Sequence, residues 1–318
     1  MNTSAPWKAL LKEIVMQMTN VIINFRRHLK RRNYSPHTVK YYLNIVKQFV
    51  LWLDVAIEQA TDKKIDAYID YLHDKRMQPA SINCYLAIIR IFYSYLKYEE
   101  QVKLTNPVKS GRRLRVPKPL PRPLREDQID QFFDVIKTKR DWAMFRLMLR
   151  CGLRVEEVSD LTLGAIDLKQ RRIMVLNGKG SKDRVVYMSD DAANGLDAYL
   201  KLRRHCRMKK VFLVEKGDYK GKPISVRGIQ KRIEYYARKS GIPVCCHRLR
   251  HTMATQLLNA EAEVETIQDL LGHNWITTTQ RYCKVSNVKV KKDYFKAMQV
   301  ILSQSENEKI QLPQISDT

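Results

Sequence analysis

The sequence lacks long uncharged apolar runs. None approaches the roughly 18 residues that a helix needs to cross a bilayer, although 44% of the 318 residues are hydrophobic. The first apolar stretch, ALLKEIVMQM, follows Lys8 and is interrupted by Lys12 and Glu13, a composition unlike that of a secretory signal peptide. We therefore expect a cytoplasmic protein whose six cysteines are reduced thiols. The apolar content suffices for one large core or two ordinary ones.

The motifs of nucleotide-driven and metal-dependent enzymes are also missing. There is no G-x-x-x-x-G-K-[ST] loop, no G-x-G-x-x-G turn and no H-E-x-x-H helix, and the carboxylates form no cluster with metal-ligand spacing. Cys245 and Cys246 are adjacent, which is poor spacing for a zinc clip, so a metal site with His247 and His251 is only a minor alternative. We expect no cofactor and no metal. An energy-driven motor is disfavoured, and a metal-dependent nuclease is unsupported.

Acidic residues are scarce relative to basic ones. Asp and Glu number 33 against 58 Lys and Arg, which gives a formal net charge of +25. A surplus of this size, spread along the chain, indicates a polyanionic partner. Nucleic acid is the first choice. An anionic membrane surface is the second, but no segment has the pattern of a basic amphipathic anchor.

Two regions of different pattern flank a basic stretch. Residues 1–108 have helical periodicity, with Ser35 as an N-cap before Pro36, and predict a four-helix DNA-binding module. Residues 109–123 predict a Pro-rich linker in which Arg112, Arg113 and Arg115 meet a phosphate backbone. Residues 124–303 predict an α+β domain whose β-hairpin is RRIMVLNGKGSKDRVVYMS, and residues 304–318 predict a flexible tail. The expected fold is mainly α with a small β-hairpin or sheet in the second domain.

One group of residues in the second domain combines cations with a possible nucleophile. It comprises Arg154 in CGLRVEEVSDL, Lys179 in NGKGSKDR, His247 and Arg250 in HRLRH, His273 in LGHNW, and Tyr282 nine residues later. His247 and Arg250 are three residues apart at the predicted start of a helix, so they share a face there. Unpaired N–H groups and the positive end of the helix dipole favour an anion at that place. HRLRH therefore predicts a cradle for one phosphate.

In this order, the motifs resemble those of the tyrosine recombinase family, which includes phage integrases and Xer-type site-specific recombinases. The resemblance extends to YSPHTVKYY in the N-terminal module, implied to be a SAM-like core-binding domain, and to the basic linker. It implies that Arg154 and Arg250 clamp the scissile phosphate and that Tyr282 is the nucleophile. The sequence departs from the commonest family spelling at Cys151, Arg248 and Lys284, and none of these matches a catalytic position.

The resemblance implies roles for the remaining residues of the group. His247 and His273 match the two histidine positions, and Glu157 matches an acidic position that supports the first arginine. Lys179 matches the hairpin lysine that protonates the leaving oxygen. Lys182, three residues later, is the alternative acid and is otherwise expected to bind a backbone phosphate.

The activity that the resemblance implies is recombination of double-stranded DNA with paired inverted half-sites, through a 3′-phosphotyrosyl intermediate and without metal or ATP. It also implies a homo-tetramer on nucleoid DNA, with a C-terminal helix near residues 289–303 reaching a neighbouring subunit. Two alternatives stay open. One is a type IB topoisomerase-like enzyme that relaxes DNA, and the other is a catalytically idle DNA-binding regulator. The target sequence, the direction of reaction and the biological setting are left open.

Overall fold

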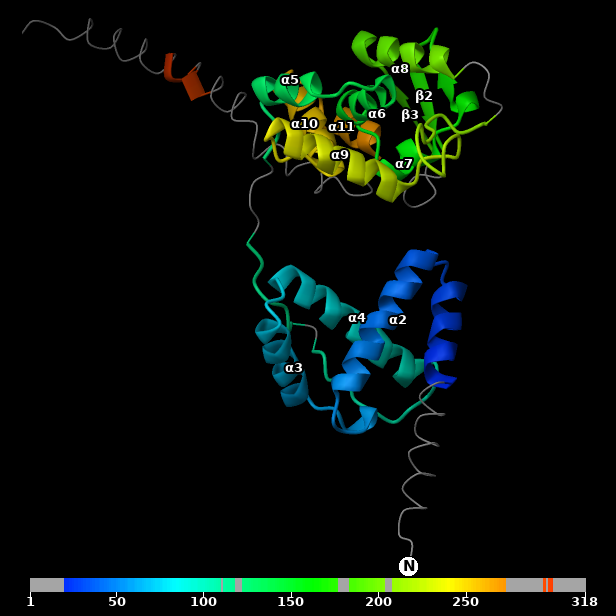
Figure 1. Cartoon of the computed structure of the whole chain (residues 1–318). Coiled ribbons are helices and arrows are strands. Elements are labelled where there is room, and N and C mark those ends of the chain that lie inside the picture. The colour runs from blue at the N-terminus through cyan, green and yellow to red at the C-terminus, as the bar shows by residue number, and fades with distance from the viewer. Residues whose placement is uncertain are drawn as a thin grey trace, which may run out of the picture. The chain divides into compact units, whose positions relative to one another are not determined.

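The computed structural model describes residues 20–109, 111–117, 122–176, 183–203, 208–272, 294–295 and 297–299. The chain divides into two compact units, Met1–Lys118 and Pro119–Thr318. Figure 1 shows the first in blue to cyan and the second in green to orange. Among the helices that the structure describes, none is long and apolar enough to cross a membrane.

The N-terminal unit is helical, as predicted. It contains helical residues 20–31, α2 (Pro36–Trp52), α3 (Asp62–Asp74) and α4 (Pro79–Tyr98), with a short 3-10 turn at Ile57–Gln59. Ser35 caps α2 because its Oγ accepts a hydrogen bond from the Thr38 N–H at 3.2 Å, and Pro36 occupies the first turn. The core of the unit is rich in aromatic residues, including Phe25, Phe49, Tyr68, Phe92 and Tyr93.

The chain does not leave this unit directly after α4. Val108 is buried in the N-terminal core, and Leu114 packs against it. Asn83 on α4 holds Leu114 from both sides: its amide nitrogen donates to the Leu114 carbonyl at 2.9 Å, and its oxygen accepts from the Leu114 N–H at 2.8 Å. The first residues of the expected linker, up to Leu114, are therefore attached to the helical unit.

The second unit is built around one buried helix and carries one small sheet. Its elements are α5 (Glu126–Asp134), α6 (Lys139–Arg150), α7 (Val155–Asp160), a 3-10 turn (Leu163–Ala165), β1 (Ile166–Asp167), β2 (Arg172–Val175), β3 (Arg184–Tyr187), α8 (Asp190–Leu202), α9 (Val226–Ser240), α10 (Cys246–Asn259) and α11 (Val264–Leu271). The predicted hairpin is present as β2 and β3, with Ile173 opposite Val186, and β1 extends it to an antiparallel sheet of order β1-β2-β3. The predicted fold class is confirmed.

Helix α6 is the centre of this unit. Its apolar residues Phe145, Leu147, Met148 and Leu149 are fully buried, and it packs against α8 and α10. Figure 1 shows it enclosed by the other helices. Because most of α6 is buried, its buried polar residues, Arg140 and Asp141, need partners inside the protein.

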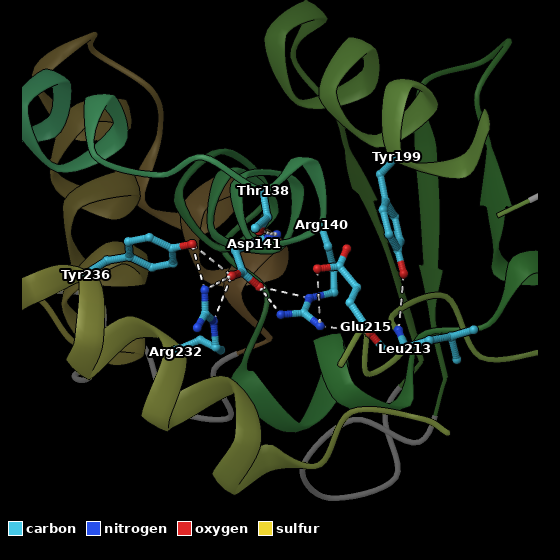
Figure 2. A network of polar contacts seen from close by, with 8 residues as sticks. All are labelled: Thr138, Arg140, Asp141, Tyr199, Leu213, Glu215, Arg232 and Tyr236. Carbon is cyan, nitrogen blue, oxygen red and sulfur yellow. Dashed lines mark hydrogen bonds and ion pairs between the residues drawn. The ribbon is translucent and has the colours of Figure 1, made fainter. Parts of the chain in front are cut away.

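A network of buried charges surrounds Asp141 of α6 (Figure 2). Asp141 is fully buried. One of its carboxylate oxygens accepts from Arg140 Nε at 2.8 Å and Nη2 at 2.7 Å. The other accepts from Arg232 Nε at 2.8 Å and from the Tyr236 hydroxyl at 3.1 Å, both on α9. Arg140 also donates to the Leu213 carbonyl at 3.0 Å. The network therefore fastens α9 and the segment around Leu213 to the central helix.

We predict that Asp141→Asn destabilises the second unit by about 3–5 kcal/mol, because it removes the buried charge that Arg140 and Arg232 share and leaves Arg140 only Glu215, 3.7 Å away. The matched control is Asp197→Asn, which removes only an exposed ion pair with Lys201 one helical turn away and is expected to cost about 0.5 kcal/mol or less. Urea unfolding monitored by circular dichroism measures both. Equal effects of the two substitutions would show that the network adds little to stability.

Candidate active site

The C-terminal end of α11 gathers three arginines from distant parts of the second unit. The carbonyl of Leu270 accepts from Arg184 Nε at 2.9 Å. The carbonyl of Leu271 accepts from Arg250 Nη2, and that of Gly272 accepts from Arg154 Nη2 at 3.0 Å. The last carbonyls of a helix have no partner within the helix and carry its negative dipole end. Three consecutive acceptors thus fix three guanidinium groups directly before His273.

Two glycines permit this arrangement. Gly272 ends α11 in the left-handed conformation, with φ of +59°, and a Cβ there would come within 3.1 Å of Arg184 Cδ. Gly152 has φ of +63°, and a Cβ there would lie 3.0 Å from Leu271 Cδ2 and 3.1 Å from Met253 Sδ. Both positions combine a backbone conformation that favours glycine with a close approach of side chains. The glycines of CGLR and LGH are therefore needed for packing around the arginines.

Arg154 is the N-cap of α7. Its backbone N–H donates to Glu157 Oε2 at 2.7 Å and its Nη1 donates to Glu157 Oε1 at 2.9 Å. Its Nη2 reaches the Gly272 carbonyl. The side chain is 22% exposed, so part of it faces solvent. Arg154 is thus held at both ends of its guanidinium while it stays accessible.

Arg250 lies on α10 and is 2% exposed. Its two terminal nitrogens donate to the carbonyls of Gly152 and Leu271. Arg250 therefore links Gly152, in the segment between α6 and α7, to the end of α11. The predicted arginine pair is brought together at this end, since Arg154 and Arg250 bind adjacent carbonyls.

His247 is in the first turn of α10, as expected, and it is exposed. Its ring meets that of His251 edge to face, with 4.1 Å between centroids.

The two cysteines beside His247 are thiols without a capping role. The N-cap residue Cys245 makes no capping hydrogen bond through its side chain. Burial raises the pKa of the neighbouring Cys246 thiol to about 12, which keeps it protonated at neutral pH. Among the residues described, no group of three or more His, Cys, Asp or Glu is arranged to hold a metal ion.

Glu157 is the charge partner of the cluster. Each of its oxygens accepts one hydrogen bond from Arg154 and one from Arg184, whose Nη1 and Nη2 lie at 2.7 and 2.8 Å. Burial of the carboxylate would raise its pKa, but the hydrogen bonds and positive charges of the two arginines outweigh burial and lower it to about 2. Glu157 is therefore ionised at neutral pH.

Several predicted residues lie outside the described part of the chain: Lys179, Lys182, His273 and Tyr282. Of the arginines expected to bind phosphates, Arg113 and Arg115 are exposed. Arg112 is instead half-buried against α3, where it donates to the Asp62 carbonyl and to Asp66 Oδ2, each at 2.8 Å. Sequence reasoning missed these partners because they lie more than 40 residues away in the chain.

Arg184 was not predicted as part of the site. It opens β3, two residues after Lys182. The sequence offers only a weak signal for it, a further arginine at the end of SKDR. Its importance depends on contacts with α7 and α11 that no local pattern contains.

We predict that Glu157 makes stability depend on pH below its ordinary pKa. Since its pKa falls from 4.5 unfolded to about 2 folded, its contribution is complete above about pH 4.5 and is lost as pH falls through about 2. It amounts to on the order of 3 kcal/mol. The difference in unfolding free energy between wild type and Glu157→Gln should therefore narrow by roughly 2 kcal/mol between pH 5 and pH 3. Glu156→Gln, which changes an exposed neighbour, is the control. A difference in unfolding free energy between wild type and Glu157→Gln that stays constant from pH 5 to pH 3 would contradict the prediction.

Comparisons with known proteins identify the family of the chain. The model of the phage integrase family matches residues 122–288, and that of the phage integrase N-terminal SAM-like domain matches residues 22–102. The tyrosine recombinase XerA of Thermococcus kodakarensis is 30% identical over 280 residues, which cover 87% of this chain and 95% of the relative. The tyrosine recombinase XerC of Thermodesulfovibrio yellowstonii is 32% identical over 283 residues, covering 84% and 93%.

Solved structures share the fold. A lambda integrase dimer bound to a COC′ core site matches with a TM-score of 0.68 at 17% identity, covering 90% of this chain and 83% of that one. XerH recombinase bound to a palindromic difH substrate matches with a TM-score of 0.67 at 18% identity, covering 83% and 80%. The resemblance stated from the motifs is thus confirmed: the chain belongs to the phage integrase family and is a tyrosine-type site-specific DNA recombinase.

Proposed function

We propose that Tyr282 attacks a DNA phosphodiester, forming a bond between its oxygen and phosphorus while the bond to the 5′-oxygen breaks. The products are a 3′-phosphotyrosyl link and a free 5′-hydroxyl. A 5′-hydroxyl of another strand then attacks the same phosphorus and releases Tyr282. One phosphoester bond replaces another at each step, so this scheme consumes no ATP and requires no metal.

The observation that supports this proposal most is the placement of the two predicted arginines. Arg154 and Arg250 bind the last two carbonyls before His273, nine residues ahead of Tyr282 in the chain. Phosphoryl transfer depends mainly on positioning and on stabilising charge on the non-bridging oxygens. Guanidinium forks match those oxygens and stay charged at any relevant pH. In this scheme Arg154 and Arg250 supply the positive charge.

The remaining roles concern protons. A tyrosine hydroxyl has a pKa of about 10, so on the order of 0.1% is ionised at neutral pH, and the nucleophile needs nearby cations and a base. We assign proton acceptance or phosphate orientation to His247, and a second such position to His273. Lys179 protonates the leaving 5′-oxygen, with Lys182 as the alternative acid. Glu157 holds Arg154 and does not take part in proton transfer, since its low pKa keeps it ionised.

The proposed substrate is double-stranded DNA with paired inverted half-sites, acted on by a homo-tetramer at the nucleoid in the cytoplasm. The related structures named above contain DNA, one of them a palindromic substrate, and the net charge of +25 suits such a partner. Arg113 and Arg115 are proposed to contact backbone phosphates from the linker, since both are exposed. Arg112 contributes less, because a phosphate would have to displace Asp66 and the Asp62 carbonyl. Exchange of the helix near residues 289–303 is proposed to join the subunits.

We predict that Tyr282→Phe abolishes covalent attachment to DNA while leaving affinity close to wild type, because it removes one oxygen and no charge. Purified protein is incubated with sheared genomic DNA of the source organism and denatured with SDS, and the DNA that stays attached is recovered and sequenced. Tyr219→Phe, a change at an exposed tyrosine elsewhere in the second unit, is the control and should form the adduct. An adduct in Tyr282→Phe, or loss of the wild-type adduct in excess EDTA, would refute the tyrosine mechanism.

We predict that Arg154→Ala slows cleavage of the recovered duplex by at least about 10³-fold, the scale on which one preorganised charge-stabilising group acts. Affinity should fall much less, since one phosphate contact among many is lost. Arg250→Ala should slow cleavage similarly and also lower the melting temperature, because it leaves the buried carbonyls of Gly152 and Leu271 without their donor. Single-turnover cleavage and fluorescence anisotropy measure the two effects. Parallel losses of affinity and rate in Arg154→Ala would make it an anchoring residue instead.

A further inference from the structure

Arg184 uses all three guanidinium nitrogens inside the protein. Its Nε donates to the Leu270 carbonyl at 2.9 Å, and its Nη1 and Nη2 donate to the two oxygens of Glu157 at 2.7 and 2.8 Å. Its side chain is 9% exposed. The paired nitrogens that would form a fork for a phosphate are thus occupied by a carboxylate. Arg250 is also buried, but its terminal nitrogens bind the neutral carbonyls of Gly152 and Leu271, whereas those of Arg184 bind a carboxylate that compensates its charge. This difference indicates a supporting role for Arg184 and not a contact with substrate.

The groups that Arg184 holds are the ones to which Arg154 is attached. Arg154 donates to Glu157 and to the Gly272 carbonyl. Arg184 grips the same carboxylate by both oxygens and the same helix end two residues earlier, at Leu270. Arg154 also reaches both oxygens, through its backbone N–H and Nη1, but these two bonds stay within the first turn of α7. The bonds from Arg184 tie the same carboxylate to the start of β3 and to the end of α11. Arg184 therefore determines where Glu157 and the end of α11 direct Arg154.

Arg184 also connects this cluster to the hairpin. It is the first residue of β3, and the connection that precedes it in the chain contains Lys179 and Lys182. Its aliphatic carbons and guanidinium lie against Gly272, where a Cβ would come within 3.1 Å of Cδ and 3.3 Å of Nη1. Glycine at the end of α11 is thus what allows β3 to approach so closely. These contacts couple three elements: the start of β3, the N-cap of α7 and the end of α11.

We propose that Arg184 is a positioning residue for the phosphoryl transfer, which fixes Arg154 relative to the end of α11 and to the hairpin and does not touch the DNA. This inference rests on the role proposed above for Arg154. It assigns to a third arginine the task of orienting the first, through the carboxylate they share.

The first test compares Arg184→Met with Arg232→Met. Both remove an arginine that pairs with a buried carboxylate in the second unit, but the ion pair of Arg232 is with Asp141, in the structural network of Figure 2. At saturating DNA, Arg184→Met is expected to slow covalent attachment by about 100-fold, the scale on which a small misplacement acts, with affinity close to wild type. Arg232→Met is expected to lower the melting temperature and leave the rate, measured well below that temperature, near wild type.

Two further variants separate positioning from charge. Arg184→Lys keeps the charge but cannot bind both oxygens of Glu157 and the Leu270 carbonyl together, so only a minor part of the rate should return. Arg184→Met combined with Glu157→Gln should be hardly slower than Arg184→Met alone, because the two act through one set of contacts. Full additivity of the two losses would overturn the proposal.

Hydrogen exchange on the DNA-free protein gives a readout that does not depend on activity. Arg184→Met should speed amide exchange in the peptide that spans residues 264–272, whereas Arg232→Met should not. If wild type forms no DNA adduct, the proposed function fails and the exchange experiment alone decides whether Arg184 fixes the end of α11. Unchanged exchange in that peptide overturns the proposal. So does a loss of DNA affinity as large as the loss of rate, or equal slowing by Arg184→Met and Arg232→Met.

Discussion

The site depends on three carbonyls at the C-terminal end of α11, which need hydrogen-bond donors from elsewhere in the protein. Leu270, Leu271 and Gly272 need donors, because the helix itself offers none at its C-terminal end. Arginines from the start of β3, from α10 and from the N-cap of α7 supply them. A single capping requirement thereby brings together segments separated by up to 118 residues of sequence. The left-handed conformation of Gly272 and the small size of Gly152 make the approach possible.

The same contacts explain how cations are kept ready for an anionic substrate. Three arginines meet here: Arg154 and Arg184 share the carboxylate of Glu157, and Arg250 donates to two backbone carbonyls. The backbone carbonyls that these arginines bind are neutral and do not cancel charge, so Arg154 and Arg184 together carry one more charge than the carboxylate they share. Arg154, which is the most exposed of the three, is the one best able to share that charge with a phosphate. The low pKa of Glu157 keeps this balance constant across the physiological range.

What could be predicted from the sequence depended on local patterns and on the order of motifs. Ser35 and Pro36 marked a helix start, and two strand-like runs around a glycine-containing turn marked the β2–β3 hairpin. The order of the motifs, through the family they resemble, implied a shared site for Arg154 and Arg250. Contacts between distant segments could not be predicted. The ion pair of Arg112 with Asp66 could not be predicted, because composition does not reveal which acid lies nearby. Arg184 and the buried Asp141 network were missed for the same reason: their partners lie on other helices and strands.

The central claim is that Arg154 and Arg250 stabilise the charge of a DNA phosphate that becomes bonded to Tyr282. The most direct measurement is mass spectrometry of the covalent adduct after nuclease and trypsin digestion. Cleavage after Arg281 and Lys284 releases the tripeptide of Tyr282, Cys283 and Lys284. The account predicts that this peptide carries a nucleotide through its 3′-phosphate. Attachment of the nucleotide to a peptide that lacks Tyr282, or through a 5′-phosphate, would contradict it.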